Sequence, residues 1–178
     1  ESHGKSIGAV LDGCPAGLEI DEKEIQKMLD LRKPGQSLIS TQRKEGDIVE
    51  IVSGVFRGHT TGAPITMIVW NSDQKSTDYE NLKTKLRPGH SDYPAMIKYN
   101  HFNDYRGGGR FSGRLTATHV MGGAIARKLL KVTLGVETNS FTTQIGKIKM
   151  ENKFDEKMIN SIYKNEVRCP EENTAKKM

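Results

Sequence analysis

The chain alternates between apolar stretches of strand length and polar stretches rich in glycine. Ser6 to Gly13 and Ala63 to Asn71 are such apolar stretches, and the second is continuous enough to predict a buried strand with Trp70 in the core. Asp47 to Gly58 is rich in β-branched residues and is interrupted by Ser53-Gly54, which predicts two strand pieces around a bulge or turn. Together these segments predict a β-meander.

Helical spacing predicts helices between these strands and after them. Asp21 and Glu24 stand at capping-box spacing, so we expect a helix from Glu22 to Leu31 that ends before Pro34-Gly35. Ser112 can cap a long helix whose apolar residues cover a broad surface. Two strand-like pieces and a capped helix complete the pattern, at Gly135 to Phe141, Gln144 to Lys149 and Asp155 to Asn165.

The stretch from Ser72 to Arg110 has no clear periodicity apart from a short helical turn near Tyr93 to Tyr99. A segment of this length without regular structure is usually functional or disordered, and its arginines, histidines and glycines favour function. The expected fold is therefore α/β of the α+β type, with long functional loops on one side. At 178 residues we expect a single domain over residues 1–178.

The charge of the chain suggests an anionic partner. The formal net charge is +5 and the pI is near 9.2, which fits a nucleic acid, a membrane surface or a small substrate with several negative charges. Apart from the tail, basic residues are spread along the chain, and no run of five like charges occurs. Binding to nucleic acid is therefore the weaker interpretation.

Cysteines and apolar runs give no sign of a metal site, a secreted protein or a membrane protein. Cys14 and Cys169 lie far apart and outside any Cys/His metal spacing, and no apolar run reaches about 18 residues. We therefore expect a reduced, cytoplasmic protein without a metal site or a membrane segment, in which Cys14 is a packed thiol.

One loop-rich segment combines four arginines with three consecutive glycines, namely Arg87, Arg106, Arg110 and Arg114 around Gly107 to Gly109. Guanidinium groups bind phosphate and carboxylate with paired donors, and glycines let the backbone approach such a ligand closely. The helix after Ser112 adds a positive dipole end. The alternative is a solvated charged loop beside a turn, and composition alone weighs the two interpretations equally.

Two histidines stand beside glycines in predicted loops, His3 near the start of the chain and His90 after Arg87. Imidazole is the usual proton donor near neutral pH, so a setting among arginines favours a general acid role for both. A lone loop histidine is more often a surface residue, and we expect His59, His101 and His119 to be structural or exposed. No nucleophile is predicted.

Six ordered segments make the chain similar to one known family. They read ESHG at Glu1, DGCPAGL at Asp12, RKPGQ at Arg32, STQRKEGD at Ser40, SGVFRGHTTGAPI at Ser53, and RPGHSDYPAMIKYN followed by DYRGGGRFSGRLTA from Arg87 to Ala117. In this order and at this length they resemble chorismate synthase, and the similarity extends from the first residue to the last.

The resemblance implies a lyase of the shikimate pathway. Members convert 5-enolpyruvylshikimate 3-phosphate to chorismate by a 1,4-anti elimination of phosphate, the last common step of aromatic amino acid biosynthesis. They require reduced FMN although no net redox change occurs, and NADPH is a candidate reductant. The Arg-rich segment would then hold a trianionic substrate against the flavin.

The resemblance also assigns roles to individual residues. It implies that His3 protonates the departing phosphate and that His90 acts beside the reduced flavin. It implies substrate-binding roles for Arg32, Arg43, Arg87 and Arg114, and FMN-binding roles for Arg110, Phe111 and Ser112. Phe111 stands where a serine is common, and Leu38 stands where many members have a further arginine, so Leu38 is not counted as a ligand.

Members of the family are roughly twice as long as this chain, so we expect it to be the N-terminal half of such a domain. The resemblance implies a sandwich of two β-sheets with outer helices, assembled as a homotetramer without nucleic acid or membrane partners. Two other hypotheses remain open at this point: a basic nucleic-acid-binding module, and an inactive structural remnant of the fold.

Overall fold

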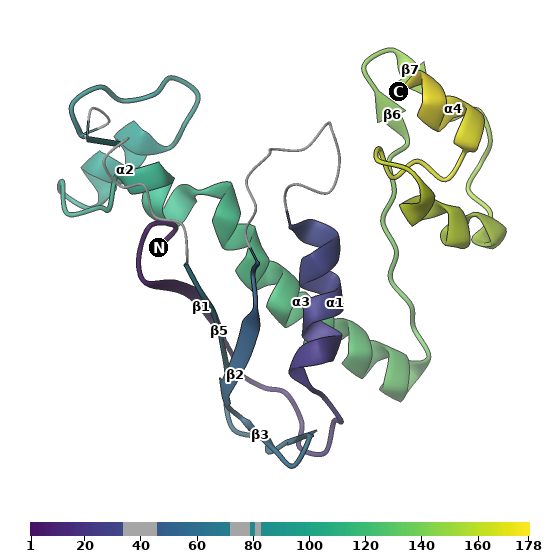
Figure 1. Cartoon of the computed structure of the whole chain (residues 1–178), viewed down its shortest axis with the longest axis horizontal. Coiled ribbons are helices and arrows are strands. Elements are labelled where there is room, and N and C mark those ends of the chain that lie inside the picture. Colours follow the sequence, from purple (N-terminus) through teal and green to yellow (C-terminus); the bar gives the residue numbers. More distant parts are fainter. Residues whose placement is uncertain (34–45, 72–78, 81–82) are drawn as a thin grey trace.

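The computed structural model describes residues 1–33, 46–71, 79–80 and 83–178. Its centre is an antiparallel sheet of three strands (Figure 1). The strand that comes last of the three in the sequence lies in the middle of the sheet. The order across this sheet is β1 (Ser6–Leu11), β5 (Ile65–Trp70) and β2 (Val49–Ser53).

Strand β5 is buried on one face because successive side chains point to opposite faces of a strand. Ile65, Met67 and Val69 are each 0% exposed and face the helices, whereas Trp70 and, on β1, Val10 lie on the other face and are 55% and 70% exposed. The predicted buried strand is confirmed. The prediction that Trp70 lies in the core is wrong, because the alternation places it on the open face.

Two helices cover the buried face of the sheet: α1 (Glu22–Arg32) and α3 (Thr116–Leu134). They pack against each other and bury Ile25 and Leu29 from α1 and Met121 and Ile125 from α3. The Asp21 side chain accepts a hydrogen bond from the Glu24 amide, which caps α1 as the capping-box spacing predicted. The helix expected from Glu22 to Leu31 is confirmed.

A short hairpin connects β2 to β5 and contains β3 (Val55–Phe56) and β4 (His59–Thr60). Gly54 begins it with φ +80°, and a Cβ at this position would lie 2.7 Å from the Ile65 Cα atom. Only glycine fits such a turn. The predicted break at Ser53-Gly54 is confirmed.

The described part of the predicted functional segment, residues 79–80 and 83–110, lies at the end of the sheet where the chain starts (Figure 1). It contains α2 (Asp92–Lys98), which confirms the expected helical turn, and a 3₁₀ segment, Arg106–Phe111, that holds the three glycines. A second 3₁₀ turn, Gly113–Leu115, leads directly into α3, and the Ser112 side chain caps it by accepting from the Arg114 amide.

Residues 144–178 form a small lobe beyond the end of α3, joined to it by residues 136–143 without regular structure (Figure 1). The predicted strand from Gly135 to Phe141 is wrong, because these residues pair with no neighbouring strand. The helix expected from Asp155 to Asn165 is a 3₁₀ helix, Glu156–Lys164, although Asp155 caps it as expected. The lobe contains β6 (Gln144–Ile145), β7 (Ile148–Lys149) and α4 (Glu172–Lys177).

The mixture of helices with an antiparallel sheet confirms the α+β class. Both cysteines are buried free thiols, as expected for Cys14. Among the described residues, none of the helices combines the length and the apolar character needed to cross a membrane.

Candidate active site

The turn at the start of the chain presents His3, whose side chain is largely buried. His3 is 9% exposed and packs edge-on against Tyr79, with ring centroids 4.7 Å apart. The neighbouring Ser2 hydroxyl lies 3.2 Å from His3 Nδ1 and 3.3 Å from the Arg106 carbonyl oxygen. The histidine turn is therefore attached to the glycine segment, far along the sequence.

Two of the three glycines each approach one of the predicted histidines. Gly107, Gly108 and Gly109 have φ angles of 55°, 85° and 51°. A Cβ on Gly107 would lie 2.1 Å from His3 Cε1, and one on Gly108 would lie 2.6 Å from His90 Cε1. The two imidazoles therefore contact consecutive residues of one turn.

Substitution of Gly107 by alanine is expected to disturb both the fold and the His3 ring. The left-handed backbone alone costs an L-residue about 1–2 kcal/mol, and the new methyl group would occupy the place of the imidazole. We expect the urea unfolding midpoint to fall. Gly113→Ala is the matched control, because a Cβ there meets nothing within 4 Å. Equal midpoints for the two variants would contradict the close contact.

Arg87, His90 and Asp92 form one hydrogen-bonded cluster at the start of α2. Arg87 Nε and Nη2 each donate to an Asp92 carboxylate oxygen at 2.8 Å, and His90 Nδ1 lies 2.8 Å from Asp92 Oδ1. Asp92 is only 9% exposed. The Arg87 guanidinium, through this hydrogen bond, lowers the pKa of Asp92 to about 2. The carboxylate thus orients both an arginine and a histidine of the predicted site.

The low pKa of Asp92 predicts a stability change in acid. Because this pKa of about 2 lies below the ordinary value of 3.8, the ionised carboxylate stabilises the fold above about pH 4 and this contribution disappears as the pH falls towards 2. Asp92→Asn should therefore flatten the decline in the free energy of unfolding between these two pH values. Urea unfolding at about pH 4 and about pH 2 measures this decline in the free energy of unfolding. The exposed Asp12→Asn variant serves as the control. An unchanged decline would show that Asp92 makes no such contribution.

A second carboxylate joins two more of the predicted arginines. Asp47 Oδ2 accepts from Arg32 Nη1 at 3.0 Å and Asp47 Oδ1 accepts from Arg114 Nη1 at 2.8 Å, and the Asp47 side chain is 0% exposed. Arg32 Nη2 also donates to the Gly113 carbonyl oxygen at 3.2 Å. Arg114 Nε donates to Asn71 Oδ1 at 2.8 Å. The end of α1, the segment before β2, the residue after β5 and the 3₁₀ turn before α3 therefore meet in one network.

Arg110 and Phe111 lie at a separate hollow beside the glycine turn. This hollow has a volume of about 420 Å³ and is lined by these two residues together with Glu1, Tyr99 and Phe102. The Phe111 and Tyr99 rings are 6.4 Å apart and tilted by 43°. Aromatic walls beside a guanidinium suit a planar ring that carries a phosphate group. The residues present therefore fit a phosphorylated flavin.

The structure places His3, His90, Arg32, Arg87, Arg114, Arg110, Phe111 and Ser112 at the same end of the sheet. Arg43 lies outside the described residues. The sequence interpretation missed Ser2, Asp47, Asn71 and Asp92, which hold the predicted residues in place. Only Ser2 and Asp92 carried a signal, because each stands within two residues of a predicted histidine. His59, His101 and His119 are exposed, as expected.

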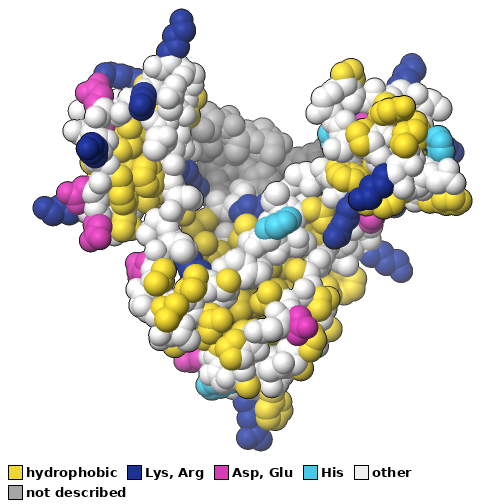
Figure 2. Space-filling view, turned by 180° about the vertical axis from the view of Figure 1, so that it is seen from behind, with side chains coloured by type: hydrophobic (Ala, Val, Ile, Leu, Met, Phe, Trp, Pro, Cys, Tyr) yellow, Lys and Arg dark blue, Asp and Glu magenta, His cyan; other side chains and the backbone are white. Residues whose placement is uncertain are grey.

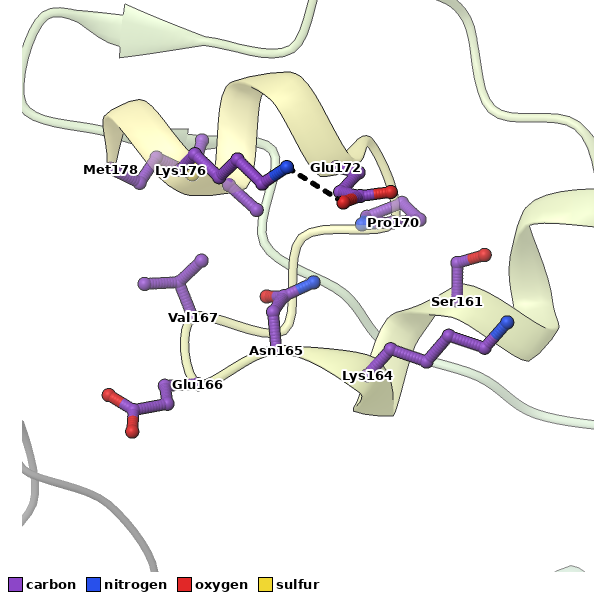
Figure 3. Close-up of a pocket in the computed structure, with 10 residues that line it drawn as sticks. Ser161, Lys164, Asn165, Glu166, Val167, Pro170, Glu172, Lys176 and Met178 are labelled. Atoms are coloured by element: carbon purple, nitrogen blue, oxygen red, sulfur yellow. Dashed lines mark ion pairs between the residues drawn. The ribbon is translucent and has the colours of Figure 1, made fainter.

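A larger hollow of about 600 Å³ lies in the C-terminal lobe, between the 3₁₀ helix and α4 (Figure 3). Its lining includes the exposed Glu172–Lys176 ion pair, 2.9 Å long, and none of the predicted site residues. The site therefore rests on the histidines and arginines rather than on the size of a cavity. In the described part of the chain, no three His, Cys, Asp or Glu side chains gather in a way that could hold a metal ion.

Comparisons with known proteins identify the family of this chain. The sequence profile of the family described as chorismate synthase matches residues 1–178. The chain is 51% identical to a chorismate synthase of Methanococcus aeolicus and 49% identical to one of Bacteroides fragilis, covering 97% and 100% of this chain. It covers 49% of each relative, so the chain spans about half the length of the curated relatives it matches.

A solved structure gives the same result. The model superimposes on a crystal structure of chorismate synthase with a TM-score of 0.70 at 31% sequence identity, covering 99% of this chain and 48% of the other. The similarity therefore includes both the sequence of the motifs and the arrangement of the elements that carry them. The chain belongs to the chorismate synthase family.

Proposed function

We propose that this protein acts as a chorismate synthase. It would convert 5-enolpyruvylshikimate 3-phosphate to chorismate and inorganic phosphate, the last common step of aromatic amino acid biosynthesis. One ring C–H bond and one C–O bond to phosphate break in this 1,4-anti elimination, and a second ring double bond forms, so no net oxidation occurs. The observation that carries the proposal is the contact of His3 and His90 with consecutive residues of one glycine turn.

The arginines suit the charges of this substrate. Arg32 and Arg114 share the single carboxylate of Asp47, so this group retains an excess positive charge. Arg87 and the protonated form of His90 share Asp92 in the same way. An excess of guanidinium over carboxylate attracts phosphate and carboxylate groups. We assign Arg32, Arg43, Arg87 and Arg114 to substrate binding.

His3 is assigned as the general acid for the leaving phosphate. Its buried position beside the Ser2 hydroxyl limits the motion of the ring, and a phosphate dianion beside the ring would favour the protonated imidazole that a general acid needs. His90 is held by Asp92 and contacts Gly108, the residue after the one that His3 contacts, and is assigned to the flavin side of the site. Two proton donors with different tasks would thus contact consecutive residues of the glycine turn.

FMN is assigned to Arg110, Phe111 and Ser112, which lie at and beside the aromatic hollow. Arg110 would bind its phosphate, while Phe111 and Tyr99 would contact the ring. Bound in reduced form, FMN would supply the electron density that helps the phosphate group to leave, and NADPH is the candidate reductant. A cytoplasmic homotetramer is proposed on family membership alone.

The test uses two samples in parallel: the full-length protein that contains this sequence, and the 178-residue chain. Each is mixed with 5-enolpyruvylshikimate 3-phosphate and photoreduced FMN in the absence of oxygen. Chorismate, followed by its absorbance, and one equivalent of inorganic phosphate are the expected products. Absence of chorismate from the complete protein would reject the proposal. Flavin titration of the 178-residue chain decides separately whether these residues bind FMN on their own.

Nucleic acid binding predicts a different surface and a different salt dependence. On the face drawn in Figure 2, the Lys and Arg side chains stand singly or in small groups rather than as a broad stripe. A basic module would bind any DNA or RNA with an affinity that falls steeply with salt, because counterions are released. The proposed enzyme should instead prefer the phosphorylated ring over an oligonucleotide.

A further inference from the structure

Asn71 connects the two halves of the proposed site through its side-chain amide. The residue directly follows β5, and its backbone amide donates to the Lys5 carbonyl oxygen at 3.0 Å, which continues the pairing with β1. Its Oδ1 atom accepts from Arg114 Nε at 2.8 Å. Its Nδ2 atom donates to the carbonyl oxygens of Gly4 at 2.8 Å and Ser2 at 3.2 Å.

Those two carbonyl groups flank His3 in the sequence, so the amide fixes the backbone on both sides of the proposed general acid. The same amide fixes one edge of the Arg114 guanidinium, while Asp47 accepts from Nη1 on that guanidinium. Asparagine is the shortest side chain that offers an acceptor for a guanidinium together with two N–H donors for two carbonyl oxygens. A carboxylate could only accept, and an aliphatic side chain could do neither.

We propose that Asn71 is a positioning residue that couples the anion-binding arginine Arg114 to the proton donor His3. A phosphate or carboxylate group that binds Arg114 displaces its guanidinium and so alters the Arg114–Asn71 hydrogen bond. The shifted Asn71 amide then changes the position of the His3 turn, to which it donates two hydrogen bonds. Substrate binding thereby sets the geometry of proton donation. The catalytic consequence of this inference rests on the proposed function. The structural connection between Arg114 and His3 depends only on the hydrogen bonds of Asn71.

Two substitutions separate the two hydrogen-bonding roles of Asn71. Asn71→Asp retains the acceptor for Arg114 and loses the donors to the His3 turn, so kcat should fall about tenfold or more while KM changes less. Asn71→Leu loses both contacts, so kcat should fall and KM should also rise. Asn160→Asp, an exposed asparagine in the C-terminal lobe, carries the same charge change and should leave both parameters unchanged.

A spectroscopic measurement tests the coupling without any activity. With ring-labelled histidine, the NMR signals of His3 should shift when Arg114 is replaced by lysine, and this shift should be lost in the Asn71→Leu background. The exposed His119 provides an internal reference, since its signals should not respond. Asn71→Ser replaces Asn71→Leu in this measurement if the leucine variant does not fold.

An Arg114→Lys shift at His3 of equal size in both backgrounds would overturn the proposed coupling, as would an Asn71→Asp protein with unaltered His3 signals. If the wild-type protein forms no chorismate, the proposed function fails, and the NMR comparison still decides whether Asn71 links Arg114 to His3. A fall in kcat for Asn71→Asp, together with a shifted His3 signal, supports both.

Discussion

Alanine in place of His3 is expected to lower kcat for chorismate formation by about 10²-fold or more, and alanine in place of His90 to have an effect of similar size. Each change removes a proton donor while the arginines that bind the substrate stay in place, so KM should change less than kcat. The two rings contact Gly107 and Gly108, and truncation of either histidine to alanine removes atoms from this contact without adding any to the glycine turn. Initial rates under anaerobic conditions with photoreduced FMN measure both parameters.

His119→Ala provides the control for these two variants, because this histidine is exposed on α3 and belongs to no part of the proposed site. Its rate should equal that of the wild-type protein. If both the His3 and His90 variants retain the wild-type rate with intact folds, the assignment of the imidazoles as proton donors is wrong. A loss confined to one of them would remove the other from the mechanism.

Replacing Asp47 with alanine should cost about 3 kcal/mol of unfolding free energy, the lower end of the range for breaking a buried ion pair. The Asp47 side chain is 0% exposed and its two partners, Arg32 and Arg114, are 21% and 12% exposed, so both guanidinium groups would lose their carboxylate without becoming well solvated. Asp47 also has φ 45°, a left-handed conformation that aspartate tolerates better than alanine. Urea unfolding at neutral pH measures the change.

Glu50→Ala is the matched control for this experiment, because Glu50 lies on the neighbouring strand β2 and is exposed. We expect its free energy of unfolding to stay near the wild-type value, since surface charges contribute little. Asp47→Asn keeps the shape of the side chain and removes the charge, so its loss should lie between the two. Equal losses for Asp47→Ala and Glu50→Ala would mean that Asp47 does not hold the arginines.

The predicted residues of the site came from local signals in the sequence. The histidines and the arginines of one segment stood beside glycines, and the ordered motifs supplied their roles. Their supporting residues gave little signal, because their partners are distant in the sequence: Asp47 binds Arg32, 15 positions away, and Arg114, 67 positions away, and Asn71 binds Arg114, 43 positions away. In the sequence, Asp47 is the first residue of one predicted strand segment and Asn71 is the last residue of another, and neither position indicates a role in a site. Their importance depends on which segments the sheet and the two helices bring together.

The sequence by itself determined the local elements whose causes are local. The cap and periodicity of Glu22 to Leu31, the glycine break before Val55 and the apolar run through Met67 all depend on neighbouring residues, and the fold contains each of them. Tertiary structure decided which face of β5 is buried, which left Trp70 exposed. It also decided that residues 136–143 pair with no strand and that His3 and His90 meet at one turn. These outcomes depend on contacts between distant segments, and the free energy of such contacts is not encoded in any short stretch of the chain.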